Sequence, residues 1–112
     1  MQYSKQVCFD EVKGIISDMF TYISNDKITP DAKMKKGLGF DIIDRINIIT
    51  EFEYKYNVSI KEDKALMTAV TLGEFCDILH KEKNANDTQI IVADKPKNTF
   101  LYRVKNLFTR QN

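Results

Sequence analysis

The sequence of 112 residues has no tryptophan, a single histidine, two cysteines and no long hydrophobic run. A membrane-spanning helix needs roughly 20 consecutive apolar residues, so no span is predicted. The chain also lacks a positively charged start followed by an apolar stretch and a small-residue cleavage site, the pattern of a secretory signal. We therefore expect a cytoplasmic protein with one modest hydrophobic core.

Side chains that bind metals or act as nucleophiles are scarce. His80 is the single imidazole, and Cys8 and Cys76 lack the paired spacing of a metal or redox motif. This set supports neither a zinc site nor a histidine-based catalytic triad, and no phosphate-binding loop is present. We expect a protein that is not an enzyme and binds no metal, with both cysteines as buried free thiols rather than a disulfide.

The formal charge of +1 hides an uneven distribution. Residues 1–82 hold 11 Lys and Arg against 14 Asp and Glu, a net charge of −3, whereas residues 83–112 hold 6 against 2, a net charge of +4. An acidic body with a basic tail can attract partners of either sign or fold back on itself. Nucleic acid is not an expected partner, because the body is acidic and no motif interleaves aromatic and basic residues.

Apolar residues recur at helical spacing through most of the body. Residues 7–23 predict a first amphipathic helix whose apolar face begins at Val7. Residues 25–39, with Pro30 and two glycines, predict a long loop pinned by a few apolar side chains. Asp41 is placed to cap a second helix. The buried stripe expected for that helix is Ile43, Ile46, Ile49, Phe52 and Tyr56, with Ile42 and Ile48 outside it.

Glu62 to Met67 can form a short third helix, and Thr71 is placed to cap a fourth. The inward face expected for the fourth helix is Leu72, Phe75, Cys76 and Leu79. These elements predict an all-α bundle over residues 1–82, followed by a linker at 83–98 with one possible short strand. Residues 99–112 predict a basic amphipathic helix. Its short apolar face favours intramolecular packing or a protein partner over a membrane surface.

The stretch LGFDIIDRINIITEFEYKY at residues 38–56 resembles the phosphopantetheine helix of acyl carrier proteins. That helix opens with a Leu-Gly-x-Asp-Ser-Leu-Asp pattern, in which the serine hydroxyl carries the prosthetic arm. Residues 28–32, 60 and 71–75 are similar to further family segments, so the resemblance runs from about Val7 to His80. It implies a four-helix bundle of acyl-carrier type with a C-terminal extension. The frame reads here Leu38-Gly39-Phe40-Asp41-Ile42-Ile43-Asp44.

Ile42 stands where the family has its attachment serine, and an alkyl side chain has no oxygen to form a phosphodiester. Thr50 and Ser59 carry hydroxyls, but neither has the helix-start position that the resemblance requires. The resemblance thus implies a carrier-like module of a fatty-acid or polyketide-type pathway that has no covalent phosphopantetheine and docks pathway enzymes through the second helix. The partner-facing residues that it implies are Asp41, Asp44, Ile43 and Glu51.

Other interpretations of the same residues stay open. Arg45 and Asn47 stand where relatives present neutral and acidic side chains, which thins the acidic recognition face. Ile42 is either a single surface residue or, with Phe40 and Ile43, part of an exposed apolar patch. The chain could also be an ordinary acyl carrier protein whose serine has been changed, or a scaffold whose basic C-terminal helix binds a protein or a membrane.

Overall fold

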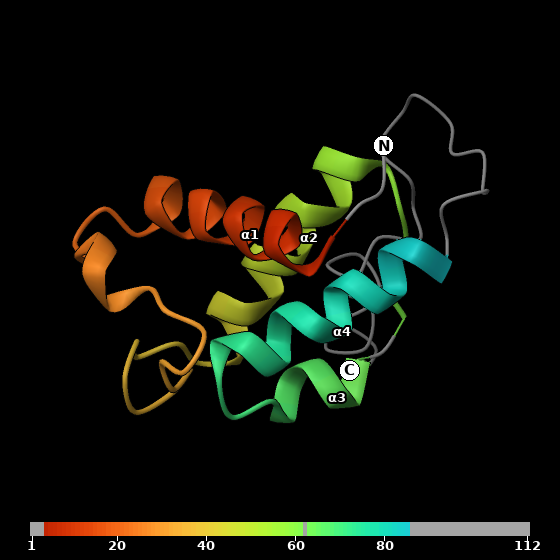
Figure 1. Cartoon of the computed structure of the whole chain (residues 1–112). Helices are drawn as coiled ribbons and strands as arrows, with labels where there is room; N and C mark the ends of the chain where they lie inside the picture. The colour runs from red at the N-terminus through yellow and green to blue at the C-terminus, as the bar shows by residue number, and fades with distance from the viewer. Residues whose placement is uncertain (1–3, 62, 86–112) are drawn as a thin grey trace, which may run out of the picture.

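The part of the protein that the structure describes is a bundle of four α-helices, as the sequence predicts. The computed structural model describes residues 4–61 and 63–85 (Figure 1). Within them the chain forms α1 (Lys5–Met19), a 3-10 turn η1 (Asn25–Lys27), α2 (Ile42–Tyr56), α3 (Asp63–Thr68) and α4 (Leu72–Ala85). The described part of the chain contains no strand beyond an isolated bridge between Lys33 and Thr71. α4 extends into residues 83–85, where the linker is predicted, and the tail predictions for residues 86–112 lie outside the described residues.

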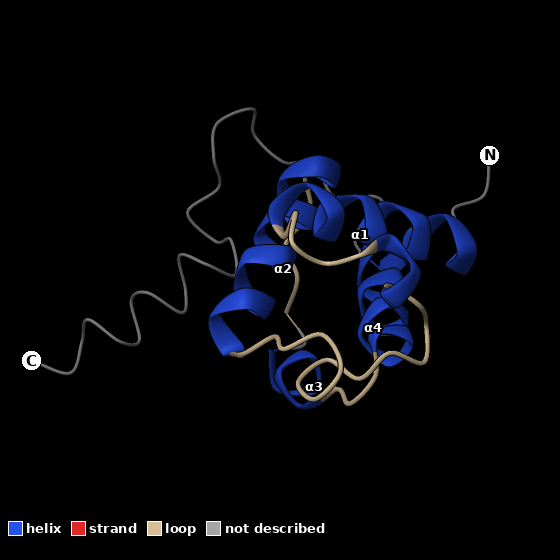
Figure 2. Ribbon diagram, turned by 90° about the vertical axis from the view of Figure 1, so that its left-hand side faces the viewer, coloured by secondary structure: helices blue, strands red, loops and turns tan. Residues whose placement is uncertain are grey.

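The helices enclose one hydrophobic core. α1 packs against α2 and α4, and α3 also contacts α2 and α4 (Figure 2). Three phenylalanines, Phe40, Phe52 and Phe75, are among the largest fully buried side chains. Their burial removes from water the apolar faces that four separate helices would otherwise expose.

The first helix buries Cys8, Val12 and Ile16, while Val7 is 41% exposed. The prediction that Val7 belongs to the inward face is therefore wrong. The first turn of α1 is oriented so that Cys8, and not Val7, contacts α4. The thiol of Cys8 donates to the carbonyl oxygen of Cys76 at 3.5 Å. Both cysteines are free and buried, as predicted, and burial raises the pKa of the Cys76 thiol.

The long segment between α1 and α2 is tied to the start of α4 by backbone hydrogen bonds. Met34 N donates to Val70 O at 2.8 Å, and Leu72 N donates to Ala32 O at the same distance. Gly73 N donates to Pro30 O at 2.7 Å, and a Cβ on Gly73 would lie 2.9 Å from that oxygen. Only glycine permits this approach. The segment is an ordered loop, as predicted, and it delivers the chain to α2 in a defined position.

The second helix begins with a reciprocal cap. The side chain of Asp41 accepts from the backbone N–H of Asp44, whose own side chain accepts from the backbone N–H of Asp41. The predicted cap is confirmed, but the predicted stripe is wrong at two positions: Ile48 is fully buried and Ile43 is 55% exposed. Because α1 and α3 both pack on α2, its buried face is wider than one stripe. Ile43 lies in the first turn, at the open end of that face.

The fourth helix starts with a second reciprocal cap. Thr71 Oγ1 accepts from Glu74 N at 3.2 Å, and Glu74 Oε1 accepts from Thr71 N at 3.0 Å. The predicted cap and the predicted inward face of this helix are both confirmed.

Removal of this cap gives a first testable prediction. We expect Thr71→Ala to lower the free energy of unfolding by about 1 kcal/mol, because the N–H of Glu74 loses its acceptor. Urea unfolding followed by circular dichroism measures the change. Thr21→Ala is the matched control, since Thr21 is exposed and no hydrogen bond from its side chain is seen among the described residues. Equal stability of the two variants would show that the cap contributes nothing.

Candidate functional site

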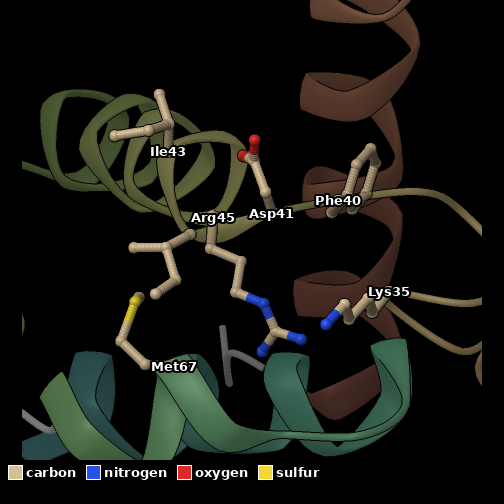
Figure 3. A pocket seen from close by; sticks show the side chains of 7 residues that line it. Lys35, Phe40, Asp41, Ile43, Arg45 and Met67 are labelled. Atoms are coloured by element: carbon tan, nitrogen blue, oxygen red, sulfur yellow. The ribbon is translucent and has the colours of Figure 1, made fainter.

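A surface cleft opens where the long loop enters α2. It has a volume of about 460 Å³ and lies between the first turn of α2, the preceding loop and α3 (Figure 3). Two of the four predicted partner-facing residues, Asp41 and Ile43, line the cleft, and so does Ile42 at the family's attachment position. The residues that line it are Lys35, Phe40, Asp41, Ile42, Ile43, Arg45 and Met67.

Ile42 is the first residue of α2 and is 54% exposed. The position is therefore open to an enzyme, but the side chain is hydrocarbon. The two other candidate hydroxyls are withdrawn from solvent: Thr50 is 4% exposed and Ser59 is 8% exposed. Thr50 Oγ1 also donates to the carbonyl oxygen of Ile46 at 2.8 Å. Neither side chain can replace a serine at the start of α2.

The expected apolar patch is smaller than the sequence indicates. Ile42 and Ile43 are exposed, as such a patch requires, but Phe40 is only 1% exposed. Its ring lies 4.7 Å from that of Phe20, centroid to centroid, so Phe40 belongs to the core and shows only an edge to the cleft. The prediction that Phe40 is an exposed docking residue is wrong, because Phe20, which caps the C-terminus of α1, supplies an aromatic partner that the local sequence does not reveal.

The carboxylates of Asp41 and Asp44 cap the N-terminus of α2. Asp41 Oδ1 accepts from Asp44 N at 2.9 Å, and Asp44 Oδ2 accepts from Asp41 N at 3.2 Å. Asp41 is exposed and Asp44 is half-buried, so both still present charge to solvent. Glu51 is exposed, but it lies about 12 Å beyond Ile43 along the helix axis at 1.5 Å per residue. The structure thus gathers Asp41, Ile42, Ile43 and Asp44 at one end of α2 and leaves Glu51 apart.

Arg45 has a structural role that the local sequence pattern does not predict. It is 6% exposed, and its Nη1 donates to the carbonyl oxygens of Leu66 at 2.8 Å and Ala69 at 2.9 Å. These bonds join α2 to the end of α3, so Arg45 is not a member of a surface recognition face. Burial lowers the pKa of its guanidinium, which nonetheless stays charged. The signal available in the sequence is spacing, since Arg45 lies one helical turn before the buried Ile49.

A second hollow of about 280 Å³ adjoins the cleft. Lys35 and Arg45 line both hollows, and Lys33 and Lys36 line the second one with Val70, which is 56% exposed. The two hollows are lined by cationic and apolar side chains, together with the polar Thr68 and one carboxylate, that of Asp41. Four cations line the two hollows beside this one carboxylate, whereas residues 1–82 as a whole carry a net charge of −3.

Residues 4–61 and 63–85 contain neither a metal-binding cluster nor a membrane-spanning helix. No group of three or more histidine, cysteine, aspartate or glutamate side chains there is arranged to hold a metal ion. In the same part of the chain, every helix is too short or too polar to cross a lipid bilayer.

Comparison with known proteins gives relatives that share one description. The chain is 28% identical over 81 residues to the acyl carrier protein of Picosynechococcus sp., covering 72% of this chain and 98% of the relative. It is 30% identical over 66 residues to the acyl carrier protein of Sulfurovum sp., covering 59% of this chain and 85% of the relative. It is 34% identical over 59 residues to the acyl carrier protein of Chloroherpeton thalassium, covering 50% of this chain and 74% of the relative. No model of a known protein family matches the chain.

Proposed function

The chain belongs to the acyl carrier protein family, and from that membership we propose that it is a carrier-like docking module without a covalent phosphopantetheine arm. One observation supports this proposal above the others. The residue at the family's attachment position, Ile42, is open to solvent but has no oxygen to accept the arm. A side chain that cannot form the phosphodiester leaves the protein its shape and its surface, but not the carrier chemistry.

We propose that this surface docks cytoplasmic enzymes of a fatty-acid or polyketide-type pathway, and that the chain itself catalyses no reaction. Ile43 supplies an exposed apolar contact at the rim of the cleft. Asp41 and Asp44 supply negative charge beside it, and Glu51 extends the charged side along α2. A small apolar centre with charged neighbours is a common composition for a protein interface.

The missing arm is tested directly by mass. The purified protein is incubated with coenzyme A and a broad-specificity phosphopantetheinyl transferase, and its intact mass is measured. We expect no change, while a typical acyl carrier protein in the same mixture gains one phosphopantetheine. Protein recovered from its native cells should likewise carry no such group. An adduct at any residue would refute the proposal.

Docking is tested with a matched pair of variants. We expect Ile43→Asp to weaken binding to a purified ketoacyl synthase by about tenfold or more, because a charge replaces an interface apolar contact. Val7→Asp is the control, since Val7 is likewise a β-branched exposed residue in the first turn of a helix. Calorimetry gives both dissociation constants. Equal affinities for the two variants would place the contact elsewhere.

The contribution of the acidic side chains to docking is tested with substitutions that preserve the helix cap. Asp44→Asn removes the charge while keeping an oxygen that can cap Asp41 N, and Glu51→Lys reverses a charge outside the cap. Deletion of residues 96–112 separates this surface from the tail. Binding that survives the deletion but falls in both substitutions supports α2 as the docking element; the reverse pattern supports the scaffold alternative.

A further inference from the structure

Arg45 is a buried cation with no carboxylate beside it in the part of the chain that the structure describes. Both N–H groups of its Nη1 are used by the carbonyl oxygens of Leu66 and Ala69. Its Nε and Nη2 groups have no partner among these residues, and the ion pair seen there, Lys55 with Glu11, lies elsewhere. Withdrawing a charge from water is costly unless an opposite charge or further hydrogen bonds compensate it. The guanidinium therefore keeps donor capacity for an anion.

A second cation faces the same space. In Figure 3 the ammonium group of Lys35 points toward the guanidinium of Arg45, and both residues line both hollows. Two like charges that share a cleft repel each other, and an anion between them would replace repulsion with two attractions. Lys33 and Lys36 add positive potential at the adjoining hollow.

The nearby acid does not neutralise this pair. The carboxylate of Asp41 points away from Arg45 in Figure 3, and its Oδ1 accepts from the backbone of Asp44 at 2.9 Å. The basic tail is also unsuited to the space, since residues 83–112 carry a net charge of +4. The charge of the cleft thus favours an anion that residues 4–61 and 63–85 do not provide.

Apart from Asp41, the rest of the cleft lining is apolar. Ile42, Ile43 and Met67 line it beside the two cations, and Phe40 shows an edge. Its volume of about 460 Å³ falls within the range of about 300–1,000 Å³ that is usual for small-molecule sites. A ligand that is complementary to both the cationic part and the apolar part of the cleft has an anionic headgroup and an apolar chain.

We propose that this cleft binds a small anionic amphiphile without a covalent bond. A phosphate or carboxylate headgroup lies between Arg45 and Lys35, and the apolar chain covers Ile42, Ile43 and Met67. The site shares Ile42 and Ile43 with the docking surface proposed above, but ligand binding needs neither a partner protein nor an attachment residue. A failure to bind enzymes would leave it standing.

The test uses the whole protein and three soluble probes with the same alkyl chain: octyl phosphate, octanoate and octyltrimethylammonium. Titrations followed by two-dimensional ¹H–¹⁵N NMR spectra give dissociation constants and locate the site. We expect one or both anions to bind, with shifts concentrated at residues 35, 40–45 and 67. Preference between them identifies the headgroup as a phosphate monoester or a carboxylate. Inorganic phosphate should bind more weakly than octyl phosphate, because it has no apolar chain.

A charge reversal completes the test. We expect Lys35→Glu to weaken binding of the preferred anion by about tenfold or more, since it places a like charge at the headgroup. Lys35 is exposed, so the fold should be unaffected, and Lys81→Glu on α4 is the control with the same change in net charge. Equal binding of octyltrimethylammonium, equal affinity for inorganic phosphate, no binding of either octyl anion, or equal affinities of the two variants would each overturn the proposal.

Discussion

The Ile42→Ser variant is expected to gain one phosphopantetheine where the unchanged protein gains none. The position is the first residue of α2 and is 54% exposed, so a hydroxyl placed there would be open to the transferase. The N–H groups of a first helical turn favour an adjacent phosphate. The two acidic residues that flank this position in the family pattern are also in place, since the side chains of Asp41 and Asp44 each accept a hydrogen bond from the other's backbone N–H. Intact-mass analysis after incubation with coenzyme A and transferase measures the gain.

The control for this experiment is Ile43→Ser. Ile43 is the next residue and is 55% exposed, so a serine there has the same accessibility but is displaced by one position around the helix. We expect it to remain unmodified. A folded Ile42→Ser variant that gains no mass would show that more than the hydroxyl has been lost, with the buried Arg45 and the neighbouring Asn47 as the first positions to restore.

Replacement of Arg45 by methionine is expected to give the largest loss of stability among the variants considered. The change leaves the carbonyl oxygens of Leu66 and Ala69 without the donor that joins α2 to α3. We expect the free energy of unfolding to fall by about 2–4 kcal/mol, the effect of losing charge-assisted hydrogen bonds less the gain from removing a buried charge. Urea unfolding gives the value. Methionine keeps most of the aliphatic stem, so the change tests the guanidinium rather than the packing.

Lys64→Met is the matched control for this change. It removes a cation from an exposed position of α3, and no ion pair of that side chain is seen in the described residues. Its effect should stay within about 0.5 kcal/mol, as for most surface substitutions. If Arg45→Met behaves in the same way, the desolvation of the guanidinium fully offsets its hydrogen bonds, and the residue is retained for a reason other than stability.

Much of the fold is predictable because its signals are local. Asp41 and Thr71 are small polar residues directly before apolar periodic segments, and both prove to be helix caps. The order of four helices, the buried thiols and the pinned loop follow from spacing along the chain in the same way. The errors concern which side chains are covered. Val7, Phe40, Ile43 and Ile48 are misassigned because burial depends on a neighbouring helix rather than on period alone.

The sequence by itself determined the most consequential property, the absence of an acceptor oxygen at Ile42, because covalent chemistry depends on residue identity and not on folding. Tertiary structure alone decided that Arg45 is buried and tied to α3 and that it faces Lys35 across an apolar cleft. These residues are far enough apart in sequence that no local pattern links them. Their energies depend on distance, desolvation and packing, which exist only once the helices have come together.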